Sequence, residues 1–195
     1  MSSRKIFIAL LIMPQIVTAQ DDGTITFHGN ILEETCNFEG VSTNGGIPSR
    51  NLIINLPATS VEKHQELAHQ NKAYPAGRFT LHFSKCSNLT SSNRLIIYFY
   101  SNNPGNSVSN RYLFLPDNTA LTAKNIGLSI QLMPQKDTYY ITQIQPNEGV
   151  IIDDRSNENG EIKLDYEISY EKIRYSNAVT PGTLSSTITY EIRYN

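Results

Sequence analysis

The stretch Gly23-Thr24-Ile25-Thr26-Phe27-His28-Gly29-Asn30-Ile31 decides the fold of this chain. Its apolar residues Ile25, Phe27 and Ile31 fall on one face at a period of two, and Gly29 lies in the same row. Polar residues occupy the alternate positions, so the pattern predicts a half-buried β-strand. A segment near a chain terminus stays poorly ordered unless something ties it down. We therefore expect its apolar face to be buried in its own domain or in a neighbouring molecule.

The residues before this strand are typical of a secretory signal peptide. Residues 1–19 begin with the basic pair Arg4 and Lys5, continue through a short apolar segment, and end in small residues at Ala19. This pattern predicts cleavage before Gln20. The apolar segment is shorter than a membrane span, which makes an N-terminal membrane anchor the less favoured interpretation. The predicted mature chain has the length of one ordinary domain.

Charge and cysteine content limit the classes of partner and of site. The whole chain has 16 basic and 18 acidic side chains, and removal of the signal peptide leaves a formal charge of −4. This balance gives no basis for a nucleic-acid or anionic-lipid partner. The two cysteines of an exported chain, Cys36 and Cys86, predict one disulfide. The alternative is two free thiols or half a metal site, but no histidine lies at ligand spacing from either cysteine.

Strand patterns dominate the rest of the chain. The apolar run at residues 95–100 suits a strand buried on both faces, and residues 161–170 and 187–194 alternate very regularly. Shorter strands are predicted at 51–56, 78–83, 112–115 and 126–132. Because turn-forming clusters separate these segments, the pattern predicts an all-β sandwich. Residues 60–70 have only a weak helical face, so a helix, a single turn and a loop remain open there.

No motif for catalysis or for cofactor binding stands out. The nucleophile-elbow, phosphate-loop and His-Glu-x-x-His patterns are all missing from the sequence. We therefore expect no catalytic residues, no metal and no cofactor. His64 and His69 are five positions apart, which does not suit two ligands on one helical face, and we predict both to be solvent-exposed.

Three weaker patterns have plainer explanations. Residues 153–160 resemble a calcium loop without its essential glycine and glutamate, so a polar connection is favoured. Asn88-Leu89-Thr90 matches the N-glycosylation acceptor, which matters only in a host that glycosylates exported proteins. The many tyrosines are compatible with a carbohydrate-stacking platform, but aromatic residues on predicted strands more often pack in a core.

Four segments taken together resemble the subunits of chaperone–usher pili, of the type 1 and P fimbrial kind. They are Phe27-x-Gly29 followed by Ile31 and Cys36; Gly77-Arg-Phe-Thr-Leu-His-Phe-Ser-Lys-Cys86 before an apolar strand; Asn125-Ile-Gly127-Leu-x-Ile130; and Pro181-Gly-x-x-x-Ser-x-Ile-x-Tyr190 with Tyr194 as the penultimate residue. No single segment is specific. Together the four segments span nearly all of the predicted mature chain, and their order and the signal peptide make the combination strong.

This resemblance implies an incomplete immunoglobulin-like sandwich that lacks its last strand. It divides the chain into a donor-strand extension at residues 20–33 and a pilin domain at residues 34–195. The donor side chains would be Ile25, Phe27 and Ile31, with Gly29 in the row where a side chain would collide with the neighbouring groove. The acceptor groove, which a chaperone also binds, would be lined by residues of the C-terminal strand: Ile188, Tyr190, Ile192 and Tyr194.

The resemblance also implies partners and a location. A periplasmic chaperone lends a strand to the groove, and at the outer-membrane usher the extension of a neighbouring subunit replaces it. Only about sixteen residues precede Cys36 in the predicted mature chain, which is typical of a minor or adaptor subunit of the cell-surface fimbrium. A carbohydrate-binding tip adhesin is the alternative, followed by an exported enzyme. Host glycans reached through the assembled pilus are left open as partners.

Overall fold

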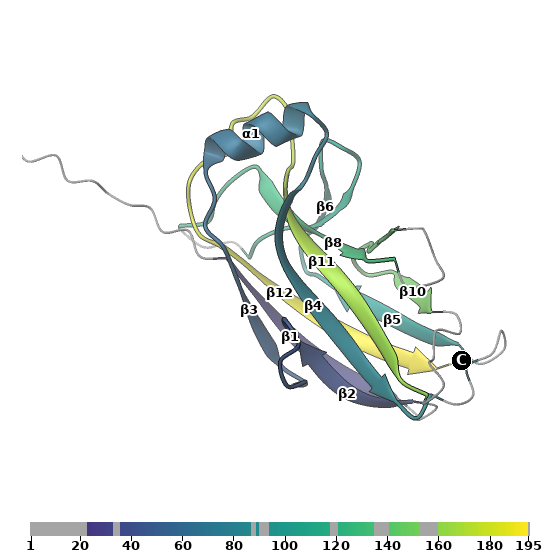
Figure 1. Cartoon of the computed structure of the whole chain (residues 1–195). Helices are drawn as coiled ribbons and strands as arrows, with labels where there is room; N and C mark the ends of the chain where they lie inside the picture. The colour runs from purple at the N-terminus through teal and green to yellow at the C-terminus, as the bar shows by residue number, and fades with distance from the viewer. Residues whose placement is uncertain are drawn as a thin grey trace, which may run out of the picture.

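The computed structural model describes residues 23–32, 36–86, 89, 94–117, 121–134, 141–152 and 160–194. Within these residues two β-sheets pack face to face, as Figure 1 shows. The predicted signal peptide at residues 1–19 lies outside the described residues. So do most of the calcium-like segment and both ends of the glycosylation triplet, Asn88 and Thr90.

The first sheet has five strands, and its central strand pair carries the candidate site. Its order is β10 (Gly149–Ile152), β5 (Leu95–Tyr100), β12 (Leu184–Tyr194), β1 (Gly23–Leu32) and β3 (Leu52–Leu56). β1 is parallel to β12, whereas the other neighbouring pairs in this sheet are antiparallel. The N-terminal strand therefore lies inside the sheet, with a hydrogen-bonded neighbour on each side.

The second sheet is antiparallel and closes the core from the other side. Its order is β2 (Asn37–Ser42), β4 (Tyr74–Ser84), β11 (Ile162–Lys172), β8 (Ile126–Leu132), β7 (Tyr112–Phe114) and β6 (Pro104–Asn106), and β9 (Thr142–Gln143) also pairs with β8. Phe79 of β4 stacks on Tyr166 of β11 at the centre of the core, with ring centroids 4.9 Å apart. The predicted all-β sandwich is confirmed, and its arrangement fits an immunoglobulin-like pilin fold.

Two strands begin earlier than predicted. β4 begins at Tyr74 and not at Arg78, because its pairing with β11 continues past a β-bulge opposite Ile168 and Ser169. β12 begins three residues before Thr187, at Leu184, which faces inward and is buried. Strand ends of this kind depend on tertiary pairing, which an alternation pattern does not contain.

A short helix covers one end of the sandwich, the end away from the C-terminus in Figure 1. This helix, α1 (Val61–His69), is capped by Ser60, whose Oγ accepts a hydrogen bond from the Lys63 N–H at 3.3 Å. The prediction of an exposed His69 is confirmed, but that of an exposed His64 is wrong, because His64 is only 4% exposed. Its ring packs edge-on against Tyr74 and Tyr170 of the second sheet.

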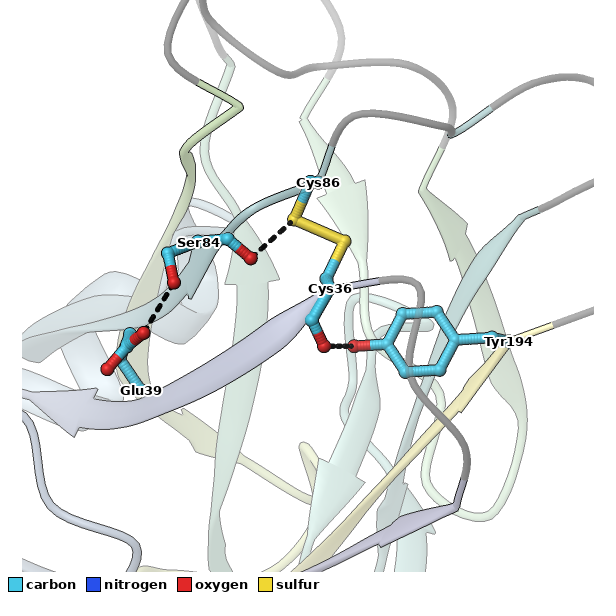
Figure 2. The surroundings of a disulfide bond; sticks show 5 residues. All are labelled: Cys36, Glu39, Ser84, Cys86 and Tyr194. Carbon is cyan, nitrogen blue, oxygen red and sulfur yellow. Dashed lines mark hydrogen bonds between the residues drawn. A yellow bond between two sulfur atoms is a disulfide. The ribbon is translucent and has the colours of Figure 1, made fainter.

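The predicted disulfide between Cys36 and Cys86 is present, and both residues are buried. Cys36 immediately precedes β2 and Cys86 follows β4, and these two strands pair at Asn37 and Ser84. Figure 2 shows a further link at this place, where the Tyr194 hydroxyl donates a hydrogen bond to the Cys36 carbonyl at 3.0 Å. The C-terminal end of β12 is therefore fastened beside the disulfide.

Candidate functional site

The candidate site is the slot between β12 and β3, which β1 fills. β1 pairs with β12 along its whole length, from Gly23 opposite Leu184 to Leu32 opposite Arg193. On its other edge, residues Gly23 to Phe27 pair with β3. In Figure 1 the purple β1 and the yellow β12 run side by side, although they come from opposite ends of the chain. The slot is thus one strand wide and open to backbone pairing on both sides.

The alternation of the opening sequence determines which face of β1 enters the core. Ile25 and Phe27 are completely buried, whereas His28 is exposed and Thr24 and Thr26 are partly exposed. On the outer face, the hydroxyls of Thr24 and Ser185 are hydrogen-bonded at 3.1 Å, and His28 Nδ1 lies 3.0 Å from Asn51 Oδ1. Polar contacts with β12 and with the residue just before β3 therefore supplement the backbone ladder.

Phe27 is the main side chain by which β1 contacts the core. Its ring centroid lies 4.7 Å from that of Phe79 and 6.4 Å from those of Phe99 and Tyr190. These three rings come from β4, β5 and β12, so Phe27 joins both sheets. Burial of two such side chains, Ile25 and Phe27, stabilises by about 3–6 kcal/mol. A sandwich without β1 would expose this aromatic cluster.

The C-terminal strand forms one wall of the slot. The structure places Ile188, Tyr190 and Ile192 on its buried inner face, and Tyr194 packs partly buried against the core. Burial raises the pKa of the Tyr190 phenol to about 12, and its hydroxyl donates a hydrogen bond to the Arg50 carbonyl at 2.9 Å. All four residues named from the sequence therefore contribute to this wall or to the core below it.

The other two residues that the sequence named for the donor strand are placed by their backbone alone. Gly29 is opposite Tyr190 and Ile31 is opposite Ile192 in the ladder. Their burial lies outside what the structure describes. The register nevertheless puts the glycine beside a residue whose large ring fills the inner face of β12.

An aromatic and charged network on the outer face of the sheet escaped the sequence reasoning. Tyr98 and Tyr100 of β5 stack with ring centroids 5.8 Å apart, and the Arg193 guanidinium lies 4.6 Å from the Tyr98 ring centre. Glu191 accepts hydrogen bonds from Arg193 and from the Tyr100 hydroxyl, which hold its pKa below the usual value. Burial raises the pKa of Tyr100, and the bond to Glu191 adds to this shift.

This network corrects the prediction that β5 is buried on both faces. Leu95, Ile97 and Phe99 are fully buried on the inner face. On the outer face Ile96 is also buried, but Tyr98 and Tyr100 are only partly buried. At these two tyrosines, their own rings and Arg193 cover the outer face. The signal was a pair of tyrosines two apart in an otherwise wholly apolar run, a spacing that places both on one face.

The described part of the chain shows no constellation for metal chemistry. No group of three or more His, Cys, Asp or Glu residues lies there in an arrangement that could hold a metal ion. No helix among those residues is long and apolar enough to cross a membrane. The most distinctive feature of the described structure is a terminal strand seated in a slot of its own domain.

A comparison with protein families covers nearly all of the described chain. The family model described as "Fimbrial protein" matches residues 25–195, which include β1 from Ile25 onward and both sheets. The chain belongs to the fimbrial protein family. It is also 28% identical over 180 residues to the "Major fimbrial subunit SMF-1" of Stenotrophomonas maltophilia (strain K279a), across 89% of this chain and 93% of that protein. As a fimbrial subunit, the protein assembles with other pilus subunits into a fimbrium at the cell surface.

Proposed function

We propose that this subunit polymerises by donor-strand exchange. In this process β1 leaves its own slot and completes the sandwich of a neighbour, while the vacated slot accepts a strand from another partner. The observation that carries the proposal is the position of β1. It is an N-terminal segment that nonetheless forms an inner strand of a sheet, with a neighbour on each edge and two fully buried side chains.

The energetics of β-strand addition fit this arrangement. Backbone hydrogen bonds to β12 and β3 supply affinity, and the alternate side chains Ile25, Phe27 and Ile31 supply specificity. When the slot is empty, β12 becomes an edge strand and β3 loses its pairing with β1, and unpaired edges invite aggregation. A strand lent by a periplasmic chaperone would prevent this until the outer-membrane usher brings the next subunit.

The proposal assigns a part to each region of the chain. Residues 1–19 direct export into the periplasm and are removed, residues 20–33 are the donor strand, and residues 34–195 form the acceptor domain. Ile188, Tyr190, Ile192 and Tyr194 line the acceptor groove and bind the chaperone strand. The function is structural and supports bacterial adhesion through the assembled fibre, without a catalytic step.

We further propose a minor or adaptor position along the fibre. The support is the short segment of about sixteen residues between the predicted cleavage site and Cys36. The relative from Stenotrophomonas maltophilia is named a major subunit, so the number of copies per fibre decides between the two positions. Quantitative mass spectrometry of purified fimbriae is expected to find this subunit well below the most abundant one, and equal or greater abundance contradicts the minor position.

Deletion of residues 20–31 tests the exchange mechanism. The truncated pilin domain is expected to accumulate in the periplasm as a complex with the chaperone and to accept a neighbour's strand, but not to donate one. The matched control is Thr26→Ala, which alters only the partly exposed face of β1 and is expected to leave polymerisation intact. Normal polymerisation of the deletion variant would refute donor-strand exchange by this segment.

A further inference from the structure

The two halves of β12 are held differently on the edge that faces away from β1. The C-terminal half pairs with β5, from Thr189 opposite Tyr100 to Tyr194 opposite Leu95. β5 ends at Tyr100, so residues 184–188 lie beyond its reach. In the described ladders, these five residues have β1 as their only strand partner.

Asp117 takes the place of the missing strand on that edge. Its backbone N–H donates to the Ser185 carbonyl at 2.7 Å. Its Oδ2 accepts from the Thr187 N–H at 3.0 Å and from the Thr187 hydroxyl at 2.9 Å. One residue therefore supplies both a donor and an acceptor, as a paired strand would, and hydrogen bonds to a charged group are the stronger kind.

Other contacts keep Asp117 in place without help from β1. The Thr122 hydroxyl donates to the Asp117 carbonyl at 3.1 Å. Just before β12, the Thr183 N–H donates to the Leu121 carbonyl, and the Ala123 N–H donates to the Thr183 carbonyl, both at 2.8 Å. These bonds belong to the pilin domain itself, so departure of β1 does not break them directly.

We infer that Asp117 is a positioning residue that keeps residues 184–188 extended while the groove is empty, ready for the incoming strand. The inference rests on the proposed donor-strand exchange. When β1 leaves, this half of β12 loses its ladder, and the backbone bond to Ser185 together with the charge-assisted bonds to Thr187 holds it in place. Once a new strand has entered, that strand fixes β12 by itself. Asp117 should therefore govern strand entry more than strand release.

The experiment follows the capture of a fluorescent peptide of residues 23–32 by the mature chain, residues 20–195, at several peptide concentrations. Loss of a charge-assisted hydrogen bond in Asp117→Ala is expected to slow capture about tenfold and to leave peptide release nearly unchanged. Asp117→Asn keeps an acceptor oxygen and is expected to restore most of the rate. The matched control is Asp165→Ala, which removes an acceptor for the Thr80 hydroxyl in the second sheet and should not affect capture.

Each outcome is decisive. If the unaltered chain captures no peptide even at about millimolar peptide concentration, which matches the effective concentration of its own tethered β1, donor-strand exchange is overturned and this inference falls with it. If the unaltered chain captures peptide and Asp117→Ala captures it equally fast or faster, only the role of Asp117 is overturned. That role is also overturned if release accelerates as much as capture slows, because that pattern indicates general stabilisation. If circular dichroism shows Asp117→Ala to be unfolded, the variant Thr187→Val replaces it. This variant removes one hydrogen-bond donor to the Asp117 carboxylate and is expected to slow peptide capture about threefold. Capture at the unaltered rate overturns the inference.

Discussion

Replacement of Phe27 by alanine tests whether a strand from another molecule can take the place of β1 in the sandwich. Phe27 is fully buried and contacts aromatic rings of three other strands. Truncation of a buried phenylalanine costs about 3–5 kcal/mol, because both the transfer energy and the packing around the cavity are lost. That cost corresponds to a loss of between about two and four powers of ten in the folding equilibrium of the mature chain.

Urea unfolding with and without an added peptide distinguishes a local from a general loss. A peptide of residues 23–32 with the natural sequence carries the missing ring, so we expect it to restore much of the stability of Phe27→Ala. The same peptide should add little to the unaltered chain, whose slot is already filled. The control is Phe83→Ala, which removes an equally buried ring from β4, packed 5.2 Å from the Phe38 ring. It should lose comparable stability without any rescue by the peptide.

Two results would refute this reasoning. If the peptide fails to stabilise Phe27→Ala, β1 is an ordinary core strand that cannot be supplied by another molecule. If it stabilises Phe83→Ala equally well, the peptide acts on the unfolded or aggregated chain and not on the slot.

Three further predictions concern the scaffold. Burial lowers the pKa of His64 to about 4, so between about pH 6.5 and pH 4 the unfolded chain binds a proton that the folded chain does not. The free energy of unfolding therefore falls by up to about 3 kcal/mol as the pH drops through that range. Thermal unfolding at pH 7 and pH 5 should show a smaller pH dependence for His64→Leu than for the unaltered chain, and an equal pH dependence contradicts the assignment. Gly40 has a φ of +138°, and an added Cβ would lie 2.7 Å from the Ser49 nitrogen, so Gly40→Ala should destabilise by about 1–3 kcal/mol. The control is Gly45→Ala, which shares a positive φ, +75°, but has open space around it, so it carries the backbone strain without the clash and should cost less. The Cys36–Cys86 disulfide closes a loop with a sequence separation of 50, so its reduction should cost about 4 kcal/mol; two alkylatable thiols in periplasmic material would contradict the bond.

The strands were predictable wherever one face alone is buried. In β1 and β12 the alternation of Ile25 and Phe27, and of Ile188 and Tyr190, is sufficient to define the inward face. What alternation does not contain is the identity of the strand's neighbours. The burial of Ile25 and Phe27 was expected, but their seat in the chain's own slot depends on pairing with residues about 160 positions away.

Polar residues with structural roles were the ones that sequence reasoning missed. His64 is buried because α1 closes the end of the sandwich over two tyrosine rings, and a count of apolar positions treats histidine as polar. Asp117 sits outside every predicted strand and acts on Thr187, 70 residues later. Such long-range hydrogen bonds leave no periodic trace in the sequence.

The parallel direction of β1 follows from how it is attached. Only three residues separate Leu32 from Cys36, and Tyr194 fastens Cys36 beside the far end of β12. The end of β1 must therefore lie at the end of β12, which permits only the parallel ladder, the slightly less stable kind. A strand from another molecule carries no such tether and is free to enter in the antiparallel direction.

The short connection between β1 and Cys36 also sets the effective concentration of β1 at the slot, and every partner strand competes against this concentration. A segment held by so short a connection has an effective concentration in the millimolar range or above. A neighbouring subunit at micromolar concentration starts at a disadvantage of about a thousandfold, or about 4 kcal/mol. Fibre growth therefore requires that pairing with the neighbour's strand be more stable than pairing with β1 by at least this free energy. The alternative is that a bound chaperone occupies the slot and keeps β1 out of it. Without one of these two conditions, dilution favours a monomer whose own β1 occupies the slot.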